Sequence, residues 1–333
     1  MDNHFQGSMI KLFSCAKIIV LFTCILTACG NTTSSSGSHP AIYVSFVSHN
    51  ERSPHLYCDS VTTDQSAYLD NRSLTAEFAQ LIVDHNAAWD MQSDYQYLDA
   101  VQQWDSDSVM NQTDHVNIIR YLSTLSPSHI VVDAHAHDLS GPNYADVVYM
   151  LQTMGAVDHG VVGGFDYQST AGDWPKFESP LAGSVFPDVA WNAEILWGAA
   201  TLDHLGKDDV TSGIWHPDPD TFYTNNESEP LVYVGGYNPN YRNLEDYTHA
   251  FDGLDDLLSK LKSGTLSAFN IYTVTVFFDQ CSMSQDMVDF FSTKISGYEA
   301  EVAAGNIYWR TIPDMVQAWK YSYAGKPSIL YGQ

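Results

Sequence analysis

Short β-rich runs alternate with amphipathic stretches along most of this 333-residue chain. The first run, residues 41–47, precedes a helix-like stretch around residues 74–86, and this order recurs toward the end of the chain. Such alternation is typical of a parallel sheet whose strands are connected by helices. Further runs are expected at residues 87–91, 129–133, 159–165, 194–197, 231–234, 269–278 and 305–309.

The stretches between these runs predict helices with recognisable ends. Gly155 should end one of them, and Thr311 and Pro313 should begin the last one. The expected helices cover residues 95–104, 117–125, 144–154, 254–261 and a segment from Thr311 to about Trp319.

Seven or eight strand–helix units without a second linker favour a single α/β domain over residues 40–333. At this length the expected fold is an irregular (β/α)7-8 barrel, TIM-like, with its chemistry at the carboxyl ends of the strands. An open doubly wound sheet is the rival fold, although no glycine fingerprint for dinucleotides follows the first run. Two abutting domains are a further alternative.

The N-terminus carries signals of export. Lys11 and Lys17 precede an apolar run at residues 18–26 that is too short to span a bilayer as a helix. The segment Leu26-Thr27-Ala28-Cys29-Gly30 resembles the lipobox of bacterial lipoproteins. The resemblance implies a signal peptide at residues 1–29, a lipid on Cys29 and anchoring to the bacterial cell envelope, at the outer membrane because Gly30 is not aspartate. An ordinary secretory signal or an uncleaved short anchor are the alternatives.

Two neighbouring segments do not contribute to the fold. Residues 1–8 contain Phe5-Gln6-Gly7-Ser8, which resembles the scar of a tag protease. Residues 30–39 are rich in Ser, Thr and Gly and are expected to form a flexible tether.

The charge is strongly acidic, with 14 Lys and Arg against 40 Asp and Glu and a formal net charge of −26. A surface of this charge repels phosphate backbones, so nucleic acid is excluded as a partner. Neutral or cationic glycans stay open as ligands. A monomer is expected.

The segment Asp133-Ala134-His135-Ala136-His137 carries the sharpest chemical pattern. Strand side chains alternate between faces, so Asp133, His135 and His137 should share one face of the sheet. Two imidazoles from one strand end can occupy two positions around a divalent metal ion, with zinc as the first expectation. The alternative is a surface turn that contains histidines by chance.

His49 and Glu51 follow the first run with the same two-residue spacing. Glu51 is a candidate metal ligand or the base that deprotonates a water molecule, and His49 a candidate ligand or acid. A surface ion pair between Glu51 and Arg52 is the alternative.

Other polar and aromatic residues follow the later runs or lie in the loop-rich region 166–230. Any of them alone is as easily a loop residue without a special task. The candidates for substrate binding are Gln92, Asp94, His204, Trp215, His216 and Gln280.

The cysteines divide by location. Cys15 and Cys24 lie within the signal and Cys29 is the lipid site, which leaves Cys58 and Cys281 in an oxidising compartment. These two follow the first run and the run at residues 269–278, which are neighbours at one mouth of the expected barrel. A disulfide between Cys58 and Cys281 is therefore predicted.

Residues 41–320 resemble the polysaccharide deacetylase (NodB-like) superfamily as a divergent member. The closing segment 305–311 with its following helix is similar to that family's last unit. The resemblance implies an irregular barrel, a divalent metal held by an Asp and two His, and an acidic catalytic base near the first strand. This chain has His49-Asn50-Glu51 in place of paired aspartates, and His135 and His137 in place of histidines three residues apart. Residues 133–137 also resemble the metal signature of amidohydrolase barrels.

The resulting hypothesis is a metal-dependent hydrolase that removes acyl groups from a carbohydrate. Glu51 acts as ligand or base, His135 and His137 as ligands, and His49 or Asp133 as acid or orienting group. A lipid-anchored glycan-binding protein without catalysis is the alternative, as is an amide or ester hydrolase acting on a different class of substrate.

Overall fold

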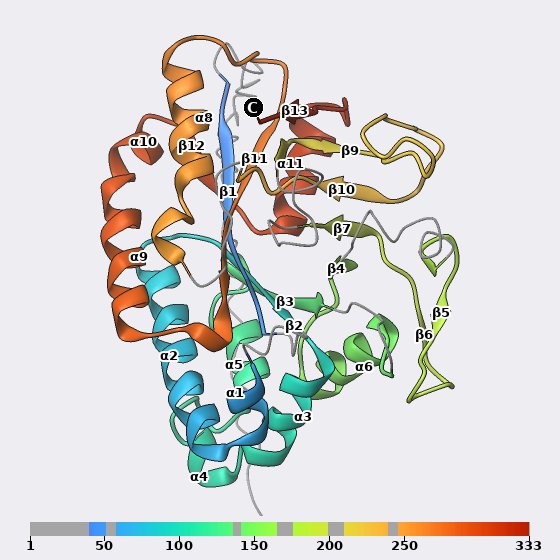
Figure 1. Ribbon diagram of the computed structural model, residues 1–333, viewed down its shortest axis with the longest axis vertical. Helices are drawn as coiled ribbons and strands as arrows, with labels where there is room; N and C mark the ends of the chain where they lie inside the picture. Colours follow the sequence, from blue (N-terminus) through green and yellow to red (C-terminus); the bar gives the residue numbers. More distant parts are fainter. Residues whose placement is uncertain are drawn as a thin grey trace, which may run out of the picture. The chain divides into compact units, whose positions relative to one another are not determined.

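A mostly parallel sheet lies at the centre of the computed structural model, which describes residues 40–50, 58–135, 141–164, 176–198, 210–238 and 246–332 (Figure 1). The strands follow the order β11-β1-β2-β3-β4-β7-β10-β9, and only β9 runs antiparallel to its neighbour among these described strands. The predicted α/β fold is therefore confirmed, whereas closure into a barrel is not shown. The strand bounds are β1 Ile42–His49, β2 Trp89–Ser93, β3 Ile130–His135, β4 Val161–Gly163, β7 Ile195–Trp197, β9 Ile214–Trp215, β10 Val232–Val234, β11 Tyr272–Asp279 and β12 Ile307–Trp309.

Strand β1 pairs with three other strands. Its whole length pairs with β11, while β12 and β2 lie one after the other along its second edge. In this register His49 lies opposite both Gln92 of β2 and Asp279 of β11. The carboxyl ends of the three strands are therefore level, which brings their polar residues to one place.

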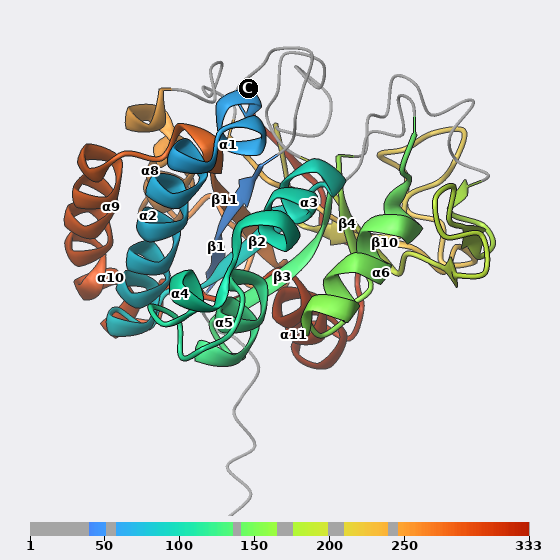
Figure 2. The same cartoon turned by 90° about the horizontal axis from the view of Figure 1, so that it is seen from below.

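Helices flank the strands on the outside (Figure 2). Helix α8 packs on β1 and β11, α5 and α6 pack on β3, and α11 contacts β10. The bounds are α1 Asp59–Thr63, α2 Gln65–Asp84, α3 Tyr95–Trp104, α4 Asp107–Met110, α5 Ile118–Leu125, α6 Tyr144–Met154, α8 Asp252–Lys262, α9 Gln285–Gly297, α10 Glu299–Ala303 and α11 Ile312–Ser322. Short elements complete the list: η3 Tyr247–His249, η4 Gln280–Ser282, and the strand pairs β5 Leu181–Ala182 with β6 Ala190–Trp191 and β8 Thr211–Ser212 with β13 Leu330–Tyr331.

Two apolar clusters cover the two faces of the sheet. Phe46, Trp89 and Val132 belong to the cluster on the helix side. Val47 and Phe277 belong to a second cluster on the opposite face, together with Val161, Ile195, Trp197 and apolar residues of α11. We call this opposite face the inner face. Because strand side chains alternate, His49 follows Val47 on the inner face at the end of β1.

All described residues belong to one unit, Gly37–Gln333. Within the part of the chain that the structure describes, we find no helix that combines the length and apolar character needed to cross a membrane.

Candidate functional site

The side chains of two buried histidines face each other from the ends of β1 and β3, the two neighbours of β2 in the sheet. His49 at the end of β1 is 2% exposed, and His135 at the end of β3 is 3% exposed. Their Nδ1 and Nε2 atoms, respectively, lie 3.4 Å apart, and their rings are perpendicular. The structure therefore brings together two of the predicted site residues that are 86 positions apart in the sequence.

The amide of Gln92 completes this arrangement. Its Oε1 lies 3.2 Å from Nδ1 of His135, on the opposite side of the ring from His49. An amide oxygen only accepts, so the Nδ1–H of His135 donates to Gln92 and Nε2 carries the lone pair that faces His49.

The spacing of the two facing nitrogens fits a shared metal ion. Zinc–nitrogen distances of about 2.0–2.1 Å at a tetrahedral angle place two ligand nitrogens about 3.4 Å apart. The same 3.4 Å is long for a direct hydrogen bond between the rings. The donor set of His49 and His135 is thus compatible with zinc, and the tautomer of His135 is the one that ligates through Nε2.

The ring of His49 also has an apolar neighbour. It packs on Phe277 with ring centroids 4.8 Å apart, and Phe277 in turn packs on Trp197 at 5.3 Å. This apolar wall excludes water from one side of the histidine pair and lowers the local dielectric, which strengthens electrostatic interactions there.

A buried carboxyl pair lies below Gln92 on the inner face. Asp90 precedes Gln92 by two residues, and Asp133 precedes His135 by two. Burial, followed by the charge of Asp133, raises the pKa of Asp90 well above its ordinary value. Burial also raises the pKa of Asp133, partly opposed by His159.

The raised pKa of Asp90 favours its protonated form. With both groups ionised, Asp90 and one oxygen of Asp133 would have no hydrogen-bond partner among the described residues. A proton on Asp90 supplies the donor that Asp133 accepts, and two adjacent carboxylates avoid carrying two charges. Asp133 then keeps its charge for His159, whose Nδ1 lies 3.2 Å from Asp133 Oδ1.

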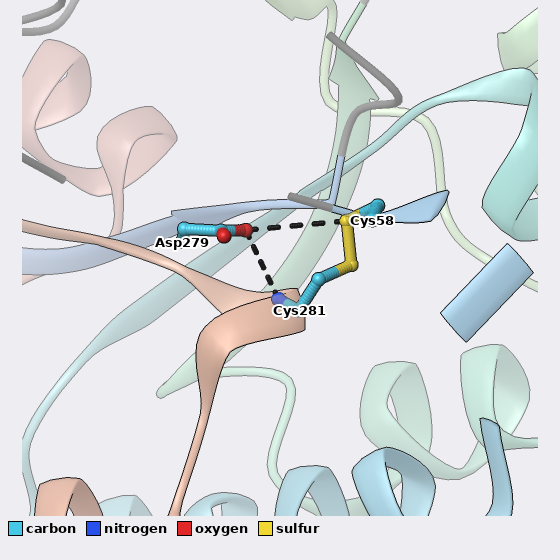
Figure 3. Close-up of side chains that lie close together, drawn as sticks. All are labelled: Cys58, Asp279 and Cys281. Atoms are coloured by element: carbon cyan, nitrogen blue, oxygen red, sulfur yellow. Dashed lines mark hydrogen bonds between the residues drawn. A yellow bond between two sulfur atoms is a disulfide. The ribbon is translucent and has the colours of Figure 1, made fainter. Parts of the chain in front are cut away.

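The predicted disulfide joins Cys58 and Cys281 (Figure 3). Asp279 lies beside it and accepts hydrogen bonds from the Cys281 N–H at 3.0 Å and from Ser282 Oγ at 2.6 Å. Among the described residues, Cys58, Asp279 and Cys281 are the only group of three potential ligands within metal-binding distance of one another. The two sulfurs are bonded to each other, so neither is a thiolate that could bind a metal ion. We therefore interpret this group as a disulfide with a neighbouring carboxylate and not as a metal site.

Two of the residues predicted to bind the substrate make hydrogen bonds within the protein. Asp94 caps α3 by accepting from the Tyr97 N–H at 2.8 Å. Gln280 is completely buried on the helix side, where its amide nitrogen donates to Thr75 and Tyr97. A role in substrate binding stays a prediction for both residues.

Trp215 and His216 lie at β9, away from the histidine pair along the sheet order. Trp215 is fully buried and donates from Nε1 to the Phe222 carbonyl at 2.8 Å. His216 Nδ1 lies 2.8 Å from the Leu231 carbonyl. Their assignment to the substrate stays a prediction as well.

Four other predicted residues fall outside the described parts of the chain. They are Cys29, Glu51, His137 and His204.

Sequence reasoning missed Asp90 and His159. Asp90 lies within the run predicted at residues 87–91, between Trp89 and Met91. A charged residue inside such a strand, on the same face as Gln92, was the available signal.

The sequence matches no family model and no curated protein. Among solved structures, the chain is similar to a candidate glycoside hydrolase/deacetylase from Parabacteroides distasonis. The TM-score is 0.50 at 10% sequence identity, over 86% of this chain and 72% of that chain. The fold is deacetylase-like. At this identity the similarity concerns the fold alone.

Proposed function

We propose that this protein is a metal-dependent hydrolase that removes acyl groups from a carbohydrate. The observation that carries the proposal is the 3.4 Å approach of His49 Nδ1 to His135 Nε2 at the carboxyl ends of β1 and β3. Two buried imidazoles at this spacing form half of a typical catalytic zinc site.

The residues have distinct proposed roles. His49 and His135 would hold the ion, with His137 as a further ligand and Glu51 as ligand or general base. A divalent ion bound there would act as a Lewis acid toward the acyl carbonyl group. Asp133 orients His159, so we place it in the support of the site rather than at the reacting atoms.

Carbohydrate is the proposed substrate class for two reasons. The structural neighbour is a candidate glycoside hydrolase/deacetylase, and the net charge of −26 disfavours polyanionic partners. We further propose that the sheet closes into an irregular barrel. The Thr275 N–H donates to the Gly236 carbonyl at 2.8 Å, which connects β11 to the segment after β10 and supports closure.

The test compares His49→Ala and His135→Ala with His129→Ala, a control at the amino end of the same strand β3. His129 contacts the hydroxyls of Ser126 and Ser128 and takes no part in the histidine pair. The starting chain and the control should hold about one zinc ion after dialysis and release acetate from acetylated sugars, and the two site variants should do neither. Equal zinc content and turnover in all four proteins would refute the proposal.

The same measurements separate the alternatives. A glycan-binding protein without catalysis would bind acetylated oligosaccharides without releasing acetate. A hydrolase of another substrate class would hold zinc and cleave simple amide or ester substrates while leaving acetylated sugars intact.

We also propose that the chain is exported, lipid-anchored through Cys29 and monomeric. The sequence at residues 18–30 supports export and lipid anchoring.

A further inference from the structure

We propose that Gln92 is a positioning residue that fixes the tautomer of His135, and that Gly163 keeps open the space that Gln92 occupies. This role replaces the expected contact between Gln92 and the substrate. The inference rests on the proposed function in one respect only, because the tautomer that Gln92 selects is the one that binds a metal ion through Nε2.

The first step is the direction of one hydrogen bond. Gln92 is fully buried and its Oε1 lies 3.2 Å from His135 Nδ1. This oxygen can only accept, so it holds the proton of His135 on Nδ1 and leaves the lone pair on Nε2, the atom that faces His49.

The second step is the orientation of the amide itself. Asp90 lies two residues earlier on β2 and therefore on the same inner face. The Gln92 amide nitrogen, however, has no hydrogen-bond partner among the described residues, the Asp90 carboxyl included. The contact between Gln92 Oε1 and His135 Nδ1 therefore orients the amide, and a flipped amide would turn a donor toward Nδ1 instead.

The third step is the glycine on the neighbouring strand. Gly163 of β4 pairs with His135 of β3. A Cβ at Gly163 would lie 1.6 Å from Gln92 Oε1 and 2.5 Å from Gln92 Cδ. The backbone of Gly163 does not lie in the left-handed region that favours glycine, so the reason for glycine here is the space taken by the amide.

The effect of such a positioning group on metal affinity can be estimated. Removing the outer hydrogen-bond partner of a metal-binding histidine weakens metal affinity about 10- to 100-fold. The same loss is expected when the amide stays in the sequence but is pushed away from the ring.

The experiment uses the full chain with five substitutions. Gln92→Met keeps the length of the side chain without an acceptor, and Gln92→Glu restores an acceptor. Gly163→Ala displaces the amide while leaving Gln92 in place. The matched control is Gly297→Ala, because a Cβ at Gly297 meets nothing within 4 Å. His135→Gln serves only to assign the His135 signals.

Two readouts are measured on each protein. Nitrogen NMR of 15N-histidine-labelled, metal-free protein reports which ring nitrogen of His135 carries the proton. Competition with a chelator gives the affinity for Zn²⁺ alone.

The starting chain, Gln92→Glu and Gly297→Ala should show His135 protonated at Nδ1. Gln92→Met and Gly163→Ala should lose this preference and bind zinc about 10- to 100-fold more weakly. An unchanged tautomer in both Gln92→Met and Gly163→Ala would overturn the inference. If the tautomer shifts as expected but no protein binds zinc, the positioning role stands and the proposed metal-dependent function fails. If Gln92→Met does not fold, Gly163→Ala decides the question.

Discussion

Asp133 Oδ1 lies 3.2 Å from His159 Nδ1, and only a quarter of the His159 side chain is exposed. Burial lowers the pKa of His159, but the hydrogen bond and charge of Asp133, with Asp158 and Asp314, outweigh it and raise the pKa overall. A raised folded-state pKa means that the stabilisation is fully present below about pH 6.5 and is lost as the pH rises through the folded pKa.

Asp133→Asn should therefore lower the pKa of His159. The measurement is an NMR titration of His159 in both proteins, with exposed His249 as the internal control because it pairs with Asp252 instead. An identical His159 titration in the two proteins would contradict the predicted pairing.

Asp90→Asn should make the free energy of unfolding less dependent on pH. Because the folded pKa of Asp90 is raised, the folded state keeps a proton that the unfolded chain loses above about pH 4, so stability falls as the pH rises from there. Relative to the starting chain, the variant should gain stability as the pH rises from 5 to 8. Urea unfolding at both values measures this, and exposed Asp99→Asn should show no such gain.

The double variant Cys58→Ser and Cys281→Ser should unfold more easily. The disulfide spans 223 residues, for which chain entropy assigns about 5 kcal/mol, and loss of a native disulfide typically costs 2–5 kcal/mol. Urea unfolding with and without a reductant is the measurement. A reductant should destabilise the starting chain and leave the double variant unaffected; equal sensitivity of both would speak against the link.

Arg72 and Asp105 form a buried bidentate ion pair, with distances of 2.7 Å and 3.2 Å. The Asp105 carboxylate also accepts from Tyr68 and from the Ile118 N–H, which connects α2 to α5. Arg72→Met should cost about 3–5 kcal/mol because it leaves a buried charge without its partner. Lys262→Met, which breaks the exposed pair with Glu301, should cost less than about 1 kcal/mol.

Cys29→Ala should abolish lipid attachment. Labelling of bacteria that express the full chain with an alkyne fatty acid should mark the starting chain and not the variant. Incorporation that is equal in both proteins would remove the lipid-anchor proposal and leave an ordinary secretory signal as the better reading of residues 18–30.

The sequence predicts helices well where local capping determines their ends. Helices α3 and α6 have the expected bounds, because Asp94 caps the first and Asn143 caps the second, with Gly155 ending it at φ 100°. Helix α9 was not anticipated, although Ser284 caps it in the same way. The capping residue Ser284 predicts the start of this helix, whereas the spacing of its apolar residues does not.

The candidate site was predictable only in part. Two-residue spacing correctly suggests a shared face for Asp133 and His135, but alternation alone does not say which face receives the helices. The sequence places Gln280 and Gln92 alike, each just after a predicted run, yet the Gln280 amide contacts Thr75 and Tyr97 on the helix side. The pairing of Asp133 with His159 depends on the approach of two strands and has no local signature.

The three-way bonding of β1 has a consequence for the order in which the molecule can assemble. Strand β1, residues 42–49, finds its partners at residues 272–279 and 307–309, far along the sequence. Strand β1 cannot complete its pairing until both of these distant segments are available, and such distant pairings slow folding.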